Sequence, residues 1–194
     1  MVTGFQGICG RGDITSLGRG GSDTTAVALS AALEAERCEI YTDVDGIYTA
    51  DPRLFPDARR LEAIDFRDML ALAKAGSKVL HPRSVELAMI NSRELELRSS
   101  FSDKPGTMLR RLRESDRPDF AGITGRADSG LISLGGKGAN SASMSKAVLL
   151  LSEKGIAVKD GRLSDNSFTL EVEKAQHMAA MELLHRELVL KQYK

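Results

Sequence analysis

The sequence predicts an α/β protein with two units: an open, mainly parallel sheet with helices on both faces, then a small ferredoxin-like βαββαβ sandwich. In residues 1–111, short apolar strands alternate with helices of apolar periodicity, which favours parallel crossovers. Residues 112–118 are charged and carry no apolar periodicity, so we expect a linker there. Beyond it, residues 119–194 alternate short strands with two helices, which is the pattern of the smaller unit.

The first unit opens with a strand, a helix and a second strand. Residues 2–8 predict a short buried strand, although their glycines weaken the pattern. An alanine-rich helix is expected over 22–36, with Ser22 as its N-cap. Residues 38–44 alternate as a strand does. This order of elements implies a right-handed parallel crossover.

Helix stops, a helix-starting proline and strand alternation predict the remaining elements. In the first unit these are a long connection from Asp45-Gly46, helices over 65–75 and 82–91, and strands over 95–101 and 106–109. In the second unit they are strands over 131–134, 156–163 and 168–172, helices over 143–153 and 175–188, and an edge strand at 189–190.

Composition excludes several function classes. The 194 residues carry 27 basic and 27 acidic side chains, so no basic excess points to nucleic acid. We find neither a membrane-spanning apolar run nor a secretory signal. Cys9 and Cys38 lack metal-ligand spacing and are expected to be reduced, mainly buried thiols. The composition therefore predicts a cytoplasmic protein without a metal site of its own.

The first candidate motif is a glycine-rich turn, Leu17-Gly18-Arg19-Gly20-Gly21-Ser22-Asp23. Its glycines allow backbone amides to approach a ligand, and a helix N-terminus favours phosphate or carboxylate. Arg19 can bind a carboxylate through two hydrogen bonds, and Asp23 can bind an ammonium group. The Gly-Lys-Ser/Thr ending of a Walker loop is missing. Taken alone, the turn could equally be a tight loop that leads into a capped helix.

The second candidate motif follows the strand at 38–44, where ligands of open α/β sheets bind. Thr42, Asp43 and Asp45 lie at the strand end, and Tyr48 and Arg53 follow on the loop. A hydroxyl and a carboxylate can bind a ribose or base edge, and arginine can neutralise phosphate charge. An Asx-type turn is the competing interpretation. The two motifs on one strand–helix–strand unit together favour a phosphate-handling site.

The two motifs, in this order and spacing, resemble the carboxyl half of the aspartate kinase catalytic domain, within the amino-acid kinase family. Two further stretches agree: Gly76-Ser77-Lys78-Val79-Leu80-His81-Pro82-Arg83-Ser84, and Arg98-Ser99-Ser100-Phe101-Ser102 with Pro105-Gly106-Thr107. The resemblance covers about residues 1–110. From about residue 120 onward the chain is similar, more loosely, to the ACT regulatory domain of these enzymes.

The resemblance implies phosphoryl transfer from ATP to L-aspartate, giving 4-phospho-L-aspartate and ADP, the first step toward lysine, threonine and methionine. It implies that magnesium arrives with the nucleotide phosphates. By the same resemblance the aspartate site comprises Phe5, Arg19, Ser22 and Asp23. The ATP contacts it implies are Thr42, Asp43, Tyr48, Arg53, Lys78 and Val79.

Parts of the family pattern are not found in this sequence. The family's Lys-Phe-Gly-Gly-Thr segment and its substrate-binding glutamate are missing, so no catalytic residue is assigned. We expect little or no kinase activity from the chain alone, and either self-association or a partner that supplies the missing lobe. One ACT-like unit is found, without the usual proline-glycine helix opening at 135–142. Through this unit the chain could bind an amino-acid effector such as lysine or threonine.

Two alternatives stay open. The chain could be a non-catalytic regulatory or dimerisation subunit that binds an amino acid through its ACT-like unit. It could also be a kinase for glutamate or carbamate, although the closing Ser99-Ser100-Phe101 segment and the ACT-like unit argue against this. His81, just before Pro82, is interpreted as a structural cap and not as a general base. His177 and His185 are expected to be surface or packing residues.

Overall fold

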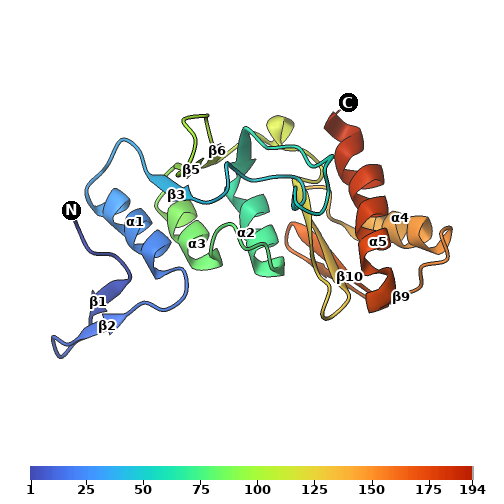
Figure 1. Cartoon of the computed structure of the whole chain (residues 1–194), viewed down its shortest axis with the longest axis horizontal. Helices are drawn as coiled ribbons and strands as arrows, with labels where there is room; N and C mark the ends of the chain where they lie inside the picture. The colour runs from blue at the N-terminus through green and yellow to red at the C-terminus, as the bar shows by residue number, and fades with distance from the viewer. Residues whose placement is uncertain (194) are drawn as a thin grey trace.

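Two four-stranded sheets organise the structure, a computed structural model that describes residues 1–193 (Figure 1). The sheet of the first unit has the order β3-β5-β6-β4. Its strands are β3 (Glu39–Thr42), β4 (Ala63–Asp65), β5 (Leu95–Ser99) and β6 (Thr107–Arg110). The pairs β3–β5 and β4–β6 are parallel, and β5–β6 is antiparallel. The predicted α/β class is confirmed, with a mixed sheet.

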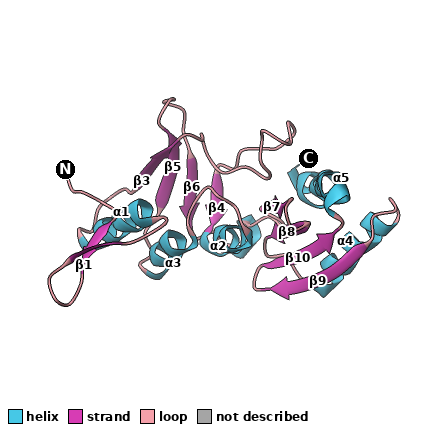
Figure 2. Cartoon of the chain, turned by 60° about the horizontal axis from the view of Figure 1, so that its bottom comes forward, coloured by secondary structure: helices cyan, strands magenta, loops and turns pink. Residues whose placement is uncertain are grey.

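Three helices pack along one face of this sheet, as Figure 2 shows. They are α1 (Gly21–Ala32), α2 (Phe66–Ala75) and α3 (Pro82–Ile90). Helices were expected on both faces, and within the described residues this is wrong. Alternation explains the difference: Ile40, Leu95 and Leu97 are buried, whereas polar side chains alternate with them on the other face of β3 and β5.

The first residues form a hairpin and not a buried sheet strand. Strand β1 (Gln6–Ile8) pairs antiparallel with β2 (Ile14–Ser16), outside both four-stranded sheets. Ile8 and Ile14 face each other and are 77% and 75% exposed. The predicted parallel crossover from this strand is therefore wrong. The turn between the strands includes Gly12, whose φ of 87° suits glycine, so a local hairpin replaces long-range pairing.

Local signals set the helix boundaries, except at the two ends of α1. Asp65 caps α2 by accepting a hydrogen bond from the Arg67 amide, and Gly76 ends the helix with a φ of 115°. Helix α1 is different: its N-cap is Gly20, not the predicted Ser22, and the helix ends at Ala32. Strand β4 was not predicted, because its three residues sit at the end of a long connection.

The second unit has the element order ββαββα instead of βαββαβ. Its strands are β7 (Gly122–Arg126), β8 (Leu131–Gly135), β9 (Val158–Ser164) and β10 (Ser167–Val172), in the antiparallel order β7-β8-β10-β9. Helices α4 (Ser141–Ser152) and α5 (His177–Leu184) complete the unit.

The predicted edge strand at 189–190 is wrong. Helix α5 continues into a π-helical turn, His185–Val189, and then a 3-10 turn, Leu190–Tyr193. The fourth strand comes instead from β7, whose two glycines hid its strand pattern. Lys194, the last residue of the expected second unit, lies outside the described residues.

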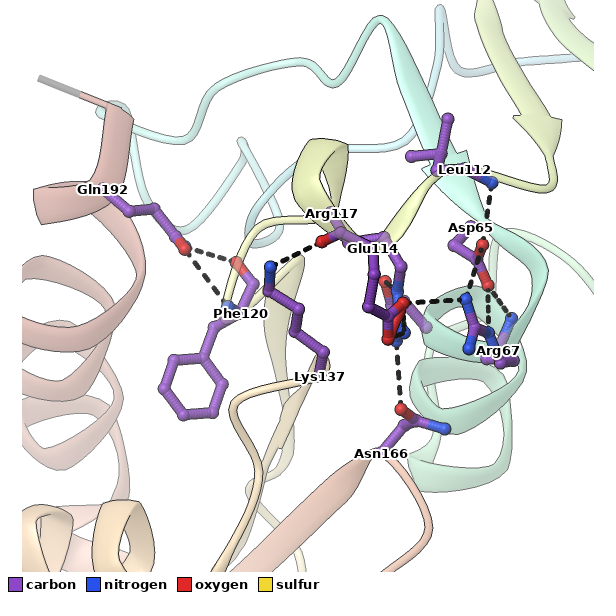
Figure 3. A network of polar contacts seen from close by, with 10 residues as sticks. Asp65, Arg67, Leu112, Glu114, Arg117, Phe120, Lys137, Asn166 and Gln192 are labelled. Atoms are coloured by element: carbon purple, nitrogen blue, oxygen red, sulfur yellow. Dashed lines mark hydrogen bonds and ion pairs between the residues drawn. The ribbon is translucent and has the colours of Figure 1, made fainter.

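A polar network connects the two units (Figure 3). The charged segment at 112–118 contains a short 3-10 helix, Glu114–Asp116, and the guanidinium of Arg117 is buried behind it. Arg117 Nε donates to Asp68 Oδ2 (3.1 Å) on α2, and Nη2 donates to Asn166 Oδ1 (3.0 Å) in the β9–β10 turn. Burial lowers the pKa of Arg117, but the hydrogen-bonded carboxylates of Asp68 and Glu114 raise it by more, so the side chain stays cationic.

Candidate functional site

A cleft of about 750 Å³ lies where the glycine-rich turn, the segment after α2 and the β7–β8 turn meet. The glycine-rich turn contributes Arg19, Gly20 and Asp23 to its lining. The segment that runs from Gly76 to Pro82 contributes Lys78 and Val79. From the second unit come Gly125 and Arg126 at the end of β7, and Ala127 and Asp128 in the turn that leads to β8. We call this feature the cleft.

Close packing between Gly20 and His81 shapes one wall of the cleft. A Cβ on Gly20 would lie 2.4 Å from His81 Cβ, and the φ of Gly20 is 72°. Only glycine satisfies both constraints without strain. His81 Nδ1 accepts a hydrogen bond from the Arg83 amide (3.3 Å) at the start of α3. The interpretation of His81 as a structural cap is confirmed, and His81 is also a cleft residue that we did not predict.

Charges of both signs line the cleft. Arg19, Lys78 and Arg126 are cationic, and Asp23 and Asp128 are carboxylates. Burial raises the pKa of Asp23, and the nearby His81 partly opposes the rise. Such a set can bind a zwitterion, with a guanidinium on its carboxylate and a carboxylate on its ammonium group.

Phe5 and Ser22 lie beside the cleft at the start of α1 but do not line it. The Phe5 amide donates to Thr25 Oγ1 (3.2 Å), and the residue has a positive φ of 68°. Its ring packs so closely on Gly21 that a Cβ there would lie 2.9 Å from Phe5 Cδ2. Ser22 is exposed in the first turn of the helix. Both are therefore neighbours of the glycine-rich turn that do not themselves line the cleft.

Four predicted nucleotide contacts lie at or after the end of β3, outside the cleft lining. Thr42 Oγ1 donates to Asp43 Oδ1 (3.0 Å), and Tyr48 Oη donates to Asp45 Oδ1 (3.0 Å). The Arg53 guanidinium donates two hydrogen bonds to the Asp51 carboxylate, yet the Arg53 side chain stays 83% exposed. Tyr48 and Arg53 belong to the connection from residue 43 to residue 62, which we call the loop.

The structure thus divides the predicted site residues into two groups. Arg19, Asp23, Lys78 and Val79 meet in the cleft, whereas Thr42, Asp43, Tyr48 and Arg53 follow β3. Sequence reasoning missed the contribution of Arg126 and Asp128, because these residues lie in the second unit and only the tertiary fold brings them to the cleft.

The remaining candidate groups have structural roles. His177 and His185 are both 2% exposed, so packing, not surface exposure, is the correct prediction for them. Both cysteines are free; Cys38 is buried and Cys9 half-buried. Among residues 1–193, no cluster of three or more His, Cys, Asp or Glu side chains could hold a metal ion. In the same residues no helix is both long and apolar enough to cross a bilayer.

Comparison with known proteins places this geometry in context. The family model described as Amino acid kinase family matches residues 1–99. An aspartate kinase of Pseudomonas putida is 51% identical over 138 residues, which is 70% of this chain and 34% of the relative. An aspartokinase of Thermus thermophilus is 45% identical over 158 residues, 81% of this chain and 39% of the relative. The chain therefore spans between a third and two fifths of these relatives.

Solved structures of aspartate kinases are also similar to this chain. Escherichia coli aspartokinase III, in complex with lysine and aspartate, is 31% identical with a TM-score of 0.57. That match covers 98% of this chain and 43% of the other. Clostridium acetobutylicum aspartate kinase has a TM-score of 0.81 at 18% identity, with 95% and 62% of the two chains covered, which shows a shared fold. The fold of nearly the whole described chain is therefore found in solved proteins.

Proposed function

The chain belongs to the amino acid kinase family, and from this premise we propose that it carries substrate sites of an aspartate kinase. The reaction is phosphoryl transfer from ATP to L-aspartate, which gives 4-phospho-L-aspartate and ADP. The observation that carries the proposal is the meeting of Arg19, Asp23 and Lys78 in one cleft. Arg19 can bind the carboxylate of an amino-acid substrate through two hydrogen bonds, and Asp23 can bind its ammonium group. Lys78 is a second cation that can bind a neighbouring phosphate.

L-Aspartate binds at the glycine-rich turn in this proposal. Arg19 donates two parallel hydrogen bonds to a substrate carboxylate, and Asp23 accepts from the substrate ammonium group. Phe5 and Ser22 form the flank of the site at the start of α1. Because Asp23 must be ionised to bind the ammonium group, its raised pKa makes aspartate affinity fall as the pH is lowered through that pKa.

ATP binds along the end of β3 and toward Lys78. Thr42 and Asp43 contact the ribose or base edge, and Tyr48 packs against the base. Arg53, Lys78 and the Val79 backbone lie on the phosphate side, where cations stabilise the charge of the transferred group. Magnesium, which enters with the nucleotide, supplies further charge neutralisation on the phosphates when it is bound.

The organisation of the chain is part of the proposal. Residues 1–111 form the nucleotide-binding part of a kinase domain, 112–118 the linker, and 119–194 an ACT-like unit. The aspartokinase III structure contains lysine, so we propose an amino-acid effector such as lysine or threonine for this chain too. We further propose a cytoplasmic protein that self-associates.

The regulatory-subunit alternative is tested together with the kinase proposal. Isothermal titration of the chain with L-aspartate and with magnesium-ADP measures the two sites separately. We expect Arg19→Ala to weaken L-aspartate roughly 10- to 100-fold, because charged bidentate hydrogen bonds are lost. Lys78→Ala is expected to weaken magnesium-ADP instead. Arg11→Ala and Lys104→Ala, both at exposed positions away from the cleft, are the matched controls.

Two results would contradict the proposal. One is an L-aspartate affinity that Arg19→Ala leaves unchanged. The other is a chain that binds lysine or threonine but no nucleotide. In that case Arg19→Ala and Lys78→Ala would leave its affinity for lysine or threonine unchanged. That second result would favour the non-catalytic subunit.

A further inference from the structure

The loop that carries Tyr48 and Arg53 is built into the core of the second unit. Ala50 and Phe55 are 4% and 6% exposed and belong to the same apolar cluster as Ile123, Leu184 and Val189. They are members of the loop at 43–62, yet the other buried members of the cluster are Phe120 and residues that follow it. A loop without internal strands is thus fixed by burial of two of its own side chains.

Thr49 is the polar centre of this attachment. The residue is fully buried, and each of its hydrogen-bonding groups has a partner. Its carbonyl accepts from the Ile123 amide (2.8 Å) of β7, and its amide donates to the Arg59 carbonyl (2.9 Å). Its hydroxyl oxygen accepts from the Arg59 amide (3.0 Å) and shares a hydrogen bond with His185 Nε2 (2.9 Å). Thr49 therefore joins the two sides of the loop, at Thr49 and Arg59, to the second unit.

His185 is the residue after α5 that contacts the loop. It is 2% exposed and begins the π-helical turn that follows α5. Its ring lies 5.7 Å from the Phe55 ring, centroid to centroid, so one side chain contacts the loop at two points. Wider π-helical turns are often found at functional sites. Arg59 adds a third contact by donating to the Tyr193 carbonyl near the end of the chain.

We propose that His185 is a positioning residue for the nucleotide, which acts through Thr49 and Phe55 on the loop. This inference rests on the proposed function, because Tyr48 and Arg53 are its nucleotide contacts. Tyr48 directly precedes Thr49, so it cannot move independently of it. Arg53 lies between the buried Ala50 and Phe55.

The segment around Arg53 is fixed from within as well. The amides of Leu54 and Phe55 both donate to the Asp51 carbonyl (3.0 and 2.9 Å). The Asp51 side chain accepts two hydrogen bonds from the Arg53 guanidinium. A loop that is already ordered loses less conformational entropy when a ligand binds, so the attachment favours nucleotide affinity.

The test compares three variants of the whole chain by titration with magnesium-ADP and with L-aspartate. His185→Phe keeps a ring against Phe55 and removes the hydrogen bond to Thr49. His185→Gln retains a group that can bond to the Thr49 hydroxyl. His177→Phe is the control, since His177 is equally buried on the same helix but bonds to the Leu131 carbonyl (3.0 Å), away from the loop. Thermal unfolding establishes that each variant is folded.

We expect His185→Phe to weaken magnesium-ADP about three- to tenfold, the effect of one buried hydrogen bond. His185→Gln should restore affinity to within about twofold, and His177→Phe should leave it unchanged. L-Aspartate affinity should stay the same in all three, because Arg19 and Asp23 do not contact the loop residues.

Three results would overturn the inference: an unchanged ADP affinity in His185→Phe, an equal loss for both ligands, or an equal loss in His177→Phe. Failure of the unsubstituted chain to bind magnesium-ADP has a different meaning, since it would overturn the proposed nucleotide site itself.

Discussion

The cleft and the loop carry the two groups of candidate ligand-binding residues, and different parts of the chain position them. Most of the cleft is formed by the first unit, where Gly20 packs directly on His81. The loop is positioned by the second unit, through Thr49 and Phe55. If both groups bind ligands as proposed, Arg19 and Asp23 on the aspartate side are positioned by the first unit. The loop residues on the nucleotide side then depend on contacts with the second unit.

The largest expected effect comes from breaking the connection between the two units. Arg117→Ala leaves the fully buried Asp68 carboxylate without its partner, and loss of one member of a buried ion pair typically costs about 3–5 kcal/mol of unfolding free energy. Urea denaturation measures the change. Arg113→Ala is the control, because Arg113 pairs with Asp116 at the surface and is 84% exposed. Equal midpoints for the two variants would show that the buried pair does not stabilise the fold.

A substitution at Gly20 should disturb the cleft and leave the loop unchanged. In Gly20→Ala the new methyl group would meet His81 at 2.4 Å while the backbone keeps a φ of 72°. We expect a loss of about 2–3 kcal/mol in stability and weaker L-aspartate binding. Gly12→Ala is the matched control, since Gly12 has a φ of 87° with open space around it. Similar L-aspartate affinities in the two variants would contradict the proposed role of the Gly20–His81 contact.

A substitution at Arg53 should change nucleotide binding at the loop without changing the stability of the chain. Its side chain is 83% exposed and bonds only to Asp51, so Arg53→Ala should leave the thermal midpoint unchanged. If Arg53 binds phosphate, magnesium-ADP affinity should fall about tenfold. Arg162→Ala is a close control, because Arg162 pairs with Asp160 two residues earlier and is 78% exposed. An ADP affinity equal to that of the control would remove Arg53 from the proposed site.

The smallest effect is a pH dependence at His185. Burial lowers the pKa of His185, and the nearby Asp57 only partly opposes this. The unfolded chain therefore takes up the proton first, so the free energy of unfolding should decrease as the pH falls below about 6.5. His185→Phe should flatten this part of the profile. Urea midpoints between about pH 7.5 and pH 5.5 measure it, and identical slopes in both proteins would contradict the assignment.

The parts of the fold that the sequence predicted correctly depend on local chemistry. Helix α2 begins at an aspartate cap and ends at a glycine with a positive φ, and α3 begins at Pro82. The antiparallel pair β5–β6 corresponds to the two strands predicted over 95–101 and 106–109. In each case the residues that determine the element lie within it or directly beside it.

The parts that were missed depend on distant residues. Thr49 and His185 are separated by 136 positions, and neither belongs to a motif that would reveal their contact. Arg126 lines the cleft only because β7 packs beside the segment that follows α2. The π-helical turn after α5 replaced a predicted strand, since apolar residues at 188–190 suit either structure until the core around them is known. Local pattern thus identified the candidate ligand contacts but not what positions the loop.

Hydrogen–deuterium exchange on the ligand-free chain tests most directly whether the second unit positions the loop. We expect His185→Phe to increase amide exchange within residues 47–59 and to leave exchange within residues 76–81 of the cleft unchanged. The amides of Thr49 and Arg59 should change most, because each donates a hydrogen bond to the other residue. Unchanged exchange in the loop, or an equal increase in loop and cleft, would show that His185 does not position the loop.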